Sequence, residues 1–129
     1  GVYRLGNTDK MATRVATTPR VNSLTLDPLT RQLYFVTDTA LYHLNGTRVQ
    51  ILASPSTVPN FSATQIGCSS KGILYIGSDN GLLTYRAATK TFSENDLTRA
   101  MVGKRIMNIN PDRNGGIWIS TDNALVVHY

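Results

Sequence analysis

A six-residue pattern occurs three times in this chain, and it constrains the fold more than any other feature. Each copy reads aliphatic, aromatic, apolar, small or β-branched, hydroxyl, aspartate. The copies are LYFVTD at Leu33–Asp38, LYIGSD at Leu74–Asp79 and IWISTD at Ile117–Asp122. Their aromatic residues are 41 and 43 positions apart. Self-similarity at a period of about 40 residues indicates a chain built from repeated structural units.

The similarity continues on both sides of each copy. An alternating apolar and polar run, followed by a polar turn, precedes each hexad. An Ala or Gly and then a Leu follow each aspartate, at Ala40-Leu41, Gly81-Leu82 and Ala124-Leu125. The opening residues Gly1–Leu5 resemble Ala40–Leu44, so we expect the chain to begin within an earlier unit. We place the repeat units at residues 1–39, 40–80 and 81–123, and residues 124–129 begin another.

Each unit has the pattern of four short β-strands. Short segments alternate between apolar and polar residues and are separated by Gly, Asp, Asn, Pro and Ser, as in strands joined by turns. For the set of four strands that contains the second hexad, we predict Ser62–Gly67, Ile73–Gly77, Leu82–Arg86 and Thr91–Glu94. No segment keeps the apolar stripe of an amphipathic helix, and the best helical candidate, Leu97–Val102, is expected to form one turn at most.

Four antiparallel strands in about 40 residues are typical of one β-propeller blade. We therefore predict an all-β fold in which residues 1–129 form a single fragment of about three blade equivalents, a partial propeller. Closed propellers typically have about four to eight blades. Because an open ring exposes strand edges, we expect either that this chain is part of a longer propeller or that a second copy completes the ring.

The hexad has a structural explanation in such a fold. A blade is covered on both faces by its neighbours, so its middle strands can be apolar on both sides. Tyr34, Tyr75 and Trp118 are predicted to be buried between blades, where each ring contributes about 2–3 kcal/mol. The hydroxyl and the aspartate are predicted to bond the backbone of the following turn. Recurrence in every unit favours a scaffold role over a catalytic role for the three aspartates.

The sequence contains no recognisable catalytic constellation. No nucleophile elbow, zinc-binding His-Glu-x-x-His or phosphate-binding loop is present. Cys68 is the only cysteine, and His43 and His128 belong to no cluster with the spacing of metal ligands. We therefore predict no catalytic, metal-binding or cofactor-binding residues, and no enzyme activity in this segment.

Charge and hydropathy argue against two further classes of partner. The formal net charge is +5, but the basic residues are scattered along the sequence, and only Lys104 and Arg105 are adjacent. A nucleic-acid-binding domain concentrates its positive charge on one face or element, so no nucleic acid is expected as a partner. No apolar run is long enough to span a bilayer, so we expect no membrane insertion by this segment. No secretory signal opens the sequence.

The last unit resembles a known repeat. The segment INPDRNGGIWISTDNALVVHY is similar to the two-component regulator propeller repeat, in which an alternating strand, an acidic residue and a Gly-containing turn precede aliphatic-Trp-Ile-Gly-Thr and a final Gly-Leu. The matching residues are Asp112, Gly116, Ile117, Trp118, Ile119, Ser120, Thr121, Asn123 and Leu125. Ala124 replaces the second Gly, and the earlier copies have Tyr34 and Tyr75 in place of Trp. The likeness covers nearly the whole chain.

This resemblance implies a sensor function. Repeats of this family usually form the periplasmic sensor region of membrane histidine kinases, often hybrid kinases of Bacteroidetes that detect carbohydrate fragments. The resemblance therefore implies a ligand-sensing propeller fragment with an oligosaccharide ligand. It also implies a periplasmic location within a larger inner-membrane protein, with the kinase chemistry outside this segment.

A second resemblance leaves an alternative open. The segment KGILYIGSDNGLLTYRAATKTF is similar to the quinoprotein-type propeller repeat, although Arg86 and Lys90 replace the usual Asp and Gly of its turn. A quinoprotein-like or other propeller would serve as a structural or protein-interaction scaffold. The ligand-binding residues stay unassigned, and the polar loops Asp112–Asn114, Ser69–Lys71 and Asn7–Lys10 are equal candidates.

Overall fold

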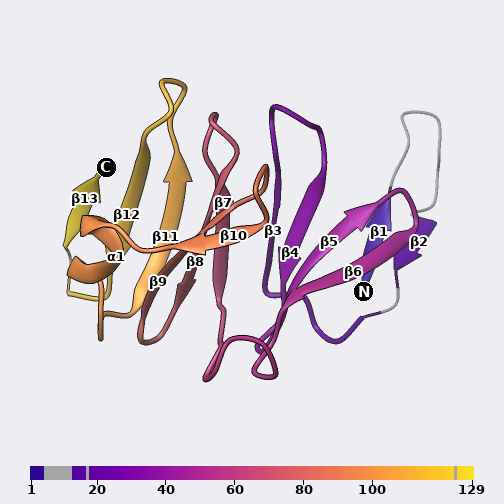
Figure 1. Ribbon diagram of the computed structural model, residues 1–129, viewed down its shortest axis with the longest axis horizontal. Coiled ribbons are helices and arrows are strands. Elements are labelled where there is room, and N and C mark those ends of the chain that lie inside the picture. The colour runs from indigo at the N-terminus through magenta and orange to yellow at the C-terminus, as the bar shows by residue number, and fades with distance from the viewer. Residues whose placement is uncertain (5–12, 17, 124) are drawn as a thin grey trace.

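The computed structural model describes residues 1–4, 13–16, 18–123 and 125–129. Within them the chain forms thirteen strands and one short helix, arranged as a row of sheets (Figure 1). The first six strands are β1 (Val2–Arg4), β2 (Thr13–Ala16), β3 (Ser23–Leu26), β4 (Leu33–Val36), β5 (Leu41–Asn45) and β6 (Arg48–Ala53). The later elements are β7 (Gln65–Cys68), β8 (Ile73–Ser78), β9 (Gly81–Arg86), β10 (Thr91–Ser93), α1 (Asp96–Ala100), β11 (Ile106–Pro111), β12 (Ile117–Thr121) and β13 (Val126–His128).

The sheets are propeller blades. Strands β3–β6 form one four-stranded sheet and β7–β10 form another, while β11–β13 form a sheet of three and β1–β2 a sheet of two. All pairings between the described strands are antiparallel. The all-β, partial-propeller prediction is confirmed, and so is the single helical turn at α1. No helix in the described ranges has the length and apolar character needed to cross a bilayer.

The apolar core lies between the sheets. One cluster, between the β3–β6 and β7–β10 sheets, contains Tyr34 of β4 and Leu74 of β8. The next cluster, between β7–β10 and β11–β13, contains Tyr75 of β8 and Ile117 of β12. Adjacent residues of a middle strand therefore face opposite neighbours, as the two-residue period of a strand requires. Tyr34 and Tyr75 are 6% and 4% exposed, so their predicted burial between blades is confirmed.

Two glycines let the third sheet approach the second closely. A Cβ atom at Gly77 would lie 2.6 Å from Ile106 Cγ2, and one at Gly67 would lie 2.7 Å from Ile109 Cγ2. Any larger residue at these positions would push β11 away from the second sheet, because interiors are close-packed. The absence of a side chain therefore keeps the first strands β7 and β11 side by side.

The row of sheets has two chemically different ends. The first and third strands of each sheet run in the same direction, so the turns that follow them lie at the same end. We call it the turn end; it contains the turns 27–32, 69–72 and 112–116, at the top of Figure 1. The opposite end, the linker end, contains the hairpins between second and third strands and the linkers 54–64 and 94–105.

Hydrogen bonds tie the linkers to the hairpins at the linker end. Gly103 N in the second linker donates to Asn80 O at 2.9 Å. Ser78 Oγ donates to Gly81 O at 3.3 Å, so this hexad hydroxyl bonds its own turn as predicted. The Asp79 carboxylate instead pairs with Arg105 Nε at 3.3 Å, because the linker supplies a cationic partner beside the hairpin.

The predicted burial of Trp118 is wrong. Its side chain is 46% exposed, although it occupies the hexad position of Tyr34 and Tyr75. Each of those tyrosines points toward the following sheet, whereas β11–β13 is the last sheet of the chain. Trp118 therefore projects from a sheet face that no described element covers. The hexad predicted the direction of the side chain correctly, and the missing neighbour leaves it exposed.

The two aromatic positions should differ in their effect on stability. Replacing Tyr75 by alanine removes a fully buried ring and should lower the free energy of unfolding by about 3–5 kcal/mol. Trp118→Ala should lower it by about 1 kcal/mol or less in this chain, since the ring is half-exposed. Urea unfolding followed by far-ultraviolet circular dichroism measures both, with Tyr75→Phe as the conservative control. Equal losses at the two positions would contradict the assignment of the core.

Candidate functional site

A pocket of about 320 Å³ opens at the linker end, between the two linkers and the second sheet. We call it the linker pocket. Its volume lies at the lower limit of typical small-molecule sites, which occupy about 300–1,000 Å³. The residues that line it are Val58, Pro59, Asn60, Phe61, Ser62, Ser78, Asn80, Gly81, Leu82, Leu83, Ser93, Glu94, Thr98, Arg99 and Val102.

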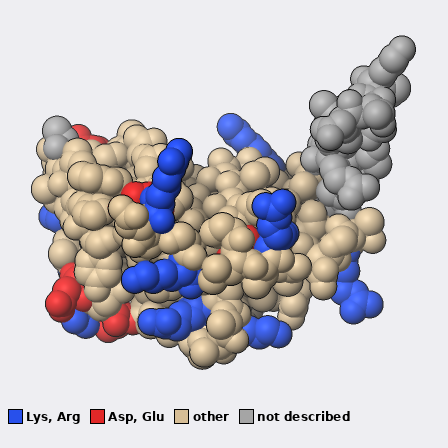
Figure 2. Space-filling model, turned by 90° about the horizontal axis from the view of Figure 1, so that it is seen from above, with Lys and Arg blue, Asp and Glu red and all other residues tan. Residues whose placement is uncertain are grey.

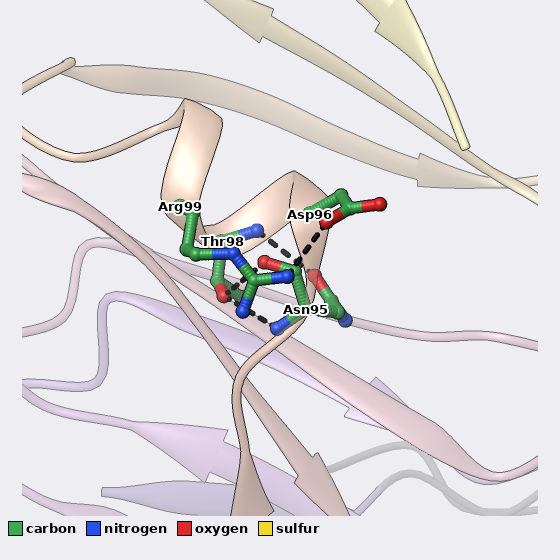
Figure 3. A network of polar contacts seen from close by, with 4 residues as sticks. All are labelled: Asn95, Asp96, Thr98 and Arg99. Carbon is green, nitrogen blue, oxygen red and sulfur yellow. Dashed lines mark hydrogen bonds and ion pairs between the residues drawn. The ribbon is translucent and has the colours of Figure 1, made fainter.

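Helix α1 forms one wall, and a capping box fixes where it begins. Asn95 Oδ1 accepts from Thr98 N at 2.9 Å, and Thr98 Oγ1 accepts from Asn95 N at 2.9 Å (Figure 3). These reciprocal bonds satisfy two backbone donors at the start of the helix. Leu97, which is buried, anchors the turn against the second sheet, so the short helix is held by its cap and by packing rather than by its length.

The first linker forms the opposite wall and part of the floor. Phe61 is 4% exposed and packs into the core between the first two four-stranded sheets. Its neighbour Asn60 has a positive φ of 61°, a conformation that Asn adopts more readily than most residues. The buried ring therefore holds the linker in place, while Asn60 and Ser62 on either side stay exposed at the pocket.

The polar groups of the linker pocket are mostly neutral hydroxyls and amides. Asn60, Ser62 and Asn80 offer hydrogen-bond donors and acceptors above an apolar floor of Phe61 and Leu82. Glu94 and Arg99 supply the charges. The guanidinium of Arg99 donates to Asp96 Oδ1 at 2.6 Å, an exposed pair that already balances its charge (Figure 3). Such an arrangement is suited to holding an uncharged polar molecule.

The loops predicted to bind a ligand lie elsewhere. Ser69–Lys71 and Asp112–Asn114 are at the turn end, and Asn7–Lys10 lies outside the described residues. Ser69 Oγ accepts from Lys71 N and Ile73 N, both at 3.3 Å, so its own turn already uses this group. The linker pocket was missed because no motif marks it. The one sequence signal for it is the Asn-x-x-Thr capping pattern at 95–98, which indicates the start of the helix that forms one wall of the pocket.

The exposed face of the last sheet carries an aromatic cluster that repeats a partly buried one in the first four-stranded sheet. Trp118 packs on His128 with ring centroids 4.5 Å apart, and His128 Nε2 donates to Asp112 Oδ2 at 2.7 Å. In the first four-stranded sheet, Tyr34 stacks on His43 at 4.8 Å, and Gln32 accepts from the histidine at 2.6 Å. The partly buried version lies at an interface between blades, so the exposed version has the chemistry of such an interface.

Two titratable groups that the sequence singled out, Cys68 and His43, have shifted pKa values. Burial, with a smaller contribution from Asp27, raises the pKa of the Cys68 thiol to about 12. Burial and then the nearby Lys90 charge lower the pKa of His43 below its usual 6.5. Within the described ranges, no three His, Cys, Asp or Glu side chains are grouped to hold a metal ion.

The buried thiol gives a direct test of the core. With a pKa near 12, Cys68 is almost entirely protonated at pH 8 and is shielded from solvent. Because the thiolate is the nucleophile, Cys68 should react with an aromatic disulfide reagent at least about a hundredfold more slowly in the native protein than in 6 M guanidinium. The absorbance of the released thiolate measures both rates. Equal rates would show that the second sheet does not pack as described.

The Asp112 carboxylate gives a test by pH. Hydrogen bonds from His128, then from Gly116 N and Asn114 N, lower the pKa of Asp112 below its ordinary 3.8. Their contribution to stability is therefore complete above about pH 5 and is lost as pH falls through 3.8 and the lower folded-state pKa. The difference in urea unfolding free energy between wild type and Asp112→Asn should shrink between pH 6 and pH 3. A constant difference would contradict these bonds.

Comparison with known proteins supports the fold and identifies one repeat. The sequence model described as "Two component regulator propeller" matches residues 101–123. No curated protein matches the chain. Among 18 matching chains of solved structures is one of YCF48 bound to a D1 peptide, with a TM-score of 0.72 and 9% sequence identity. The match covers 98% of this chain and 42% of that one, so this chain spans less than half the length of that neighbour. The chain is thus a β-propeller fragment in which residues 101–123 match the two-component regulator propeller model.

Proposed function

We propose that this chain is the ligand-sensing part of an extracytoplasmic propeller in a two-component sensor histidine kinase, and that the linker pocket takes an oligosaccharide. The observation that carries the proposal is the position of the matched repeat. It begins at Met101, and the next residue, Val102, lines the linker pocket. The segment that resembles a sensor repeat therefore contributes a residue to the wall of the linker pocket.

The lining of the linker pocket fits a sugar better than an ion. A neutral sugar presents hydroxyl groups that both donate and accept, and Ser and Asn side chains do the same. The apolar floor at Phe61 and Leu82 suits the C–H faces of a pyranose ring. The pocket is open to solvent on one side, so an oligosaccharide could extend beyond it with only part of its length bound.

The proposal places the kinase elsewhere in a larger protein. In this proposal the membrane span and the catalytic domain belong to other segments of an inner-membrane protein, and this propeller lies in the periplasm. Ligand binding would then act on the output domain through the rest of the propeller. The support for this arrangement is the family of the matched repeat.

The uncovered face of β11–β13 fits this picture. Trp118, His128 and Asp112 repeat a cluster whose tyrosine, Tyr34, is buried between blades. We propose that a further blade covers this face, either from the rest of the propeller or from a second copy of the chain. Burying the half-exposed indole there would add about 1–2 kcal/mol to that interface.

A protein-interaction scaffold is the second candidate, and a quinoprotein-like propeller of that kind stays open. One observation favours it: the similar structure of YCF48 is bound to a D1 peptide, so a propeller of this shape can hold a protein segment. In that case the linker pocket would have no saccharide ligand. The two candidates therefore differ in a measurable property.

A thermal-shift screen of neutral oligosaccharides, followed by calorimetry of any hit, tests the sensor proposal. We expect at least one saturable ligand, and Ser62→Ala with Asn80→Ala should weaken its binding about tenfold, because two hydrogen bonds are lost. The matched control, Ser70→Ala with Asn114→Ala, removes the same groups at the turn end and should leave the affinity unchanged. If no oligosaccharide binds, or if both double variants lose affinity equally, the linker pocket is not the sensor site.

A further inference from the structure

Charged residues divide unequally between the two ends of the propeller. The six cations at the turn end whose side chains the structure describes are all exposed. Figure 2, which looks down on that end, shows blue Lys and Arg side chains projecting from the surface. The six cations are Arg31, Arg48, Lys71, Arg86, Lys90 and Arg113. Five acidic residues lie at the linker end instead: Asp38, Asp79, Glu94, Asp96 and Asp122. Basic residues that are scattered in the sequence are thus gathered by the topology.

The two acidic residues described at the turn end, of which Asp112 also lines the hollow described below, offset only part of the charge of the six cations. Asp27 is 1% exposed and accepts from Leu29 N at 2.9 Å. Asp112 accepts from His128 and from the backbone of its own turn. None of the ion pairs found among the described residues involves a turn-end cation. By contrast, Arg99 and Arg105 at the linker end are both paired.

A hollow of about 320 Å³ lies among these cations, where the first strands β3, β7 and β11 end. Its wall combines the aliphatic side chains of Leu26, Pro28 and Pro111 with the guanidinium-bearing Arg113. Leu26 and the nearby Leu29 are 45% and 65% exposed, so they add apolar surface beside the cations. The turn end therefore offers apolar and cationic groups together.

Contacts between neighbouring turns hold this surface together. A Cβ atom at Gly72 would lie 3.3 Å from Leu29 Cδ1, so the first and second turns touch. A Cβ atom at Gly115 would lie 2.6 Å from Lys71 Cε, so the lysine stem crosses onto the third turn, which carries Arg113. The aliphatic part of Lys71 is thus packed while its ammonium group stays at the surface.

We propose that the turn end is a docking surface for an acidic protein segment that carries aliphatic side chains. Carboxylates of the segment pair with the unpaired cations, and its aliphatic side chains enter the hollow beside Leu26 and Pro111. Charge complementarity of this kind sets the partner and the rate of encounter. Acidic saccharides and nucleic acids are poorer matches, because sugar rings and bases stack on aromatic side chains and the residues that line this hollow include none.

The docking surface is separate from the linker pocket. The two lie at opposite ends of the strands and share no lining residue. An oligosaccharide sensor and a pure interaction scaffold could both carry it, so this inference stands independently of the proposed function.

Fluorescence anisotropy of a labelled octapeptide of alternating glutamate and leucine, titrated with the full 129-residue chain, tests the inference. We expect saturable binding that weakens as salt rises from about 50 to 500 mM. Arg31→Gln with Arg113→Gln should weaken it about tenfold, since two charge pairs are lost. The matched control, Arg20→Gln with Lys104→Gln, removes the same net charge at the linker end and should change the affinity less than twofold.

Three further probes separate the alternatives. A lysine and leucine octapeptide should not bind, and a glutamate and serine octapeptide should bind at least about threefold more weakly, because the hollow receives no apolar side chain. Tetragalacturonate and a twelve-nucleotide single-stranded DNA represent acidic sugars and nucleic acids. If either binds more tightly than the glutamate and leucine peptide, or if the linker-end control loses as much affinity as the turn-end variant, the inference is overturned. Unfolding midpoints within 2 °C of wild type confirm that both variants are folded.

Discussion

Apolar contact between neighbouring sheets is the constraint on which the rest of this structure depends. Each middle strand is apolar on both sides, so one sheet alone would leave a whole face exposed to water. Tyr34 and Tyr75 occupy the same position in successive sheets and fill successive interfaces. Gly67 and Gly77 bring the third sheet within reach. The hexad therefore supplies the side chains that pack one blade against the next. It is repeated because each blade packs against two neighbours.

The packing of each hexad against the following sheet also explains why the aromatic residue of the third hexad is exposed and those of the first two are buried. Trp118 has the largest ring of the three hexads and is the only one of their aromatic residues that is exposed. Its cluster with His128 and Asp112 reproduces the Tyr34 cluster, except that a carboxylate replaces the amide of Gln32. The proposed interface is ordered within this chain, because Asp112 orients His128 and the indole of Trp118 packs on the histidine ring.

The sequence predicted local structure well and long-range arrangement poorly, for a physical reason. In the central sheet, alternation and turn residues placed all four strands within three residues of their observed bounds, such as Gln65–Cys68 for a predicted Ser62–Gly67. These are short-range properties. The linker pocket requires residue 60 to lie near residue 99, and the basic surface requires Arg31 and Arg113 to share an end. Neither follows from local pattern, because only the pairing of strands brings them together.

Strand direction also explains how charged residues that are scattered in the sequence come to be separated, with cations at the turn end and acidic residues at the linker end. In an antiparallel sheet of four, the first and third turns necessarily lie at one end, so a cation in either turn adds to the same surface. Arg31 and Arg48 arise in this way from one sheet, and Lys71, Arg86 and Lys90 from the next. The opposite end holds five acidic residues, two in the linker 94–105 and three in the hairpins between second and third strands. A preference for cations in the turns after the first and third strands is therefore repeated in each blade. Each further blade of the same kind would extend the basic turn end and the acidic linker end.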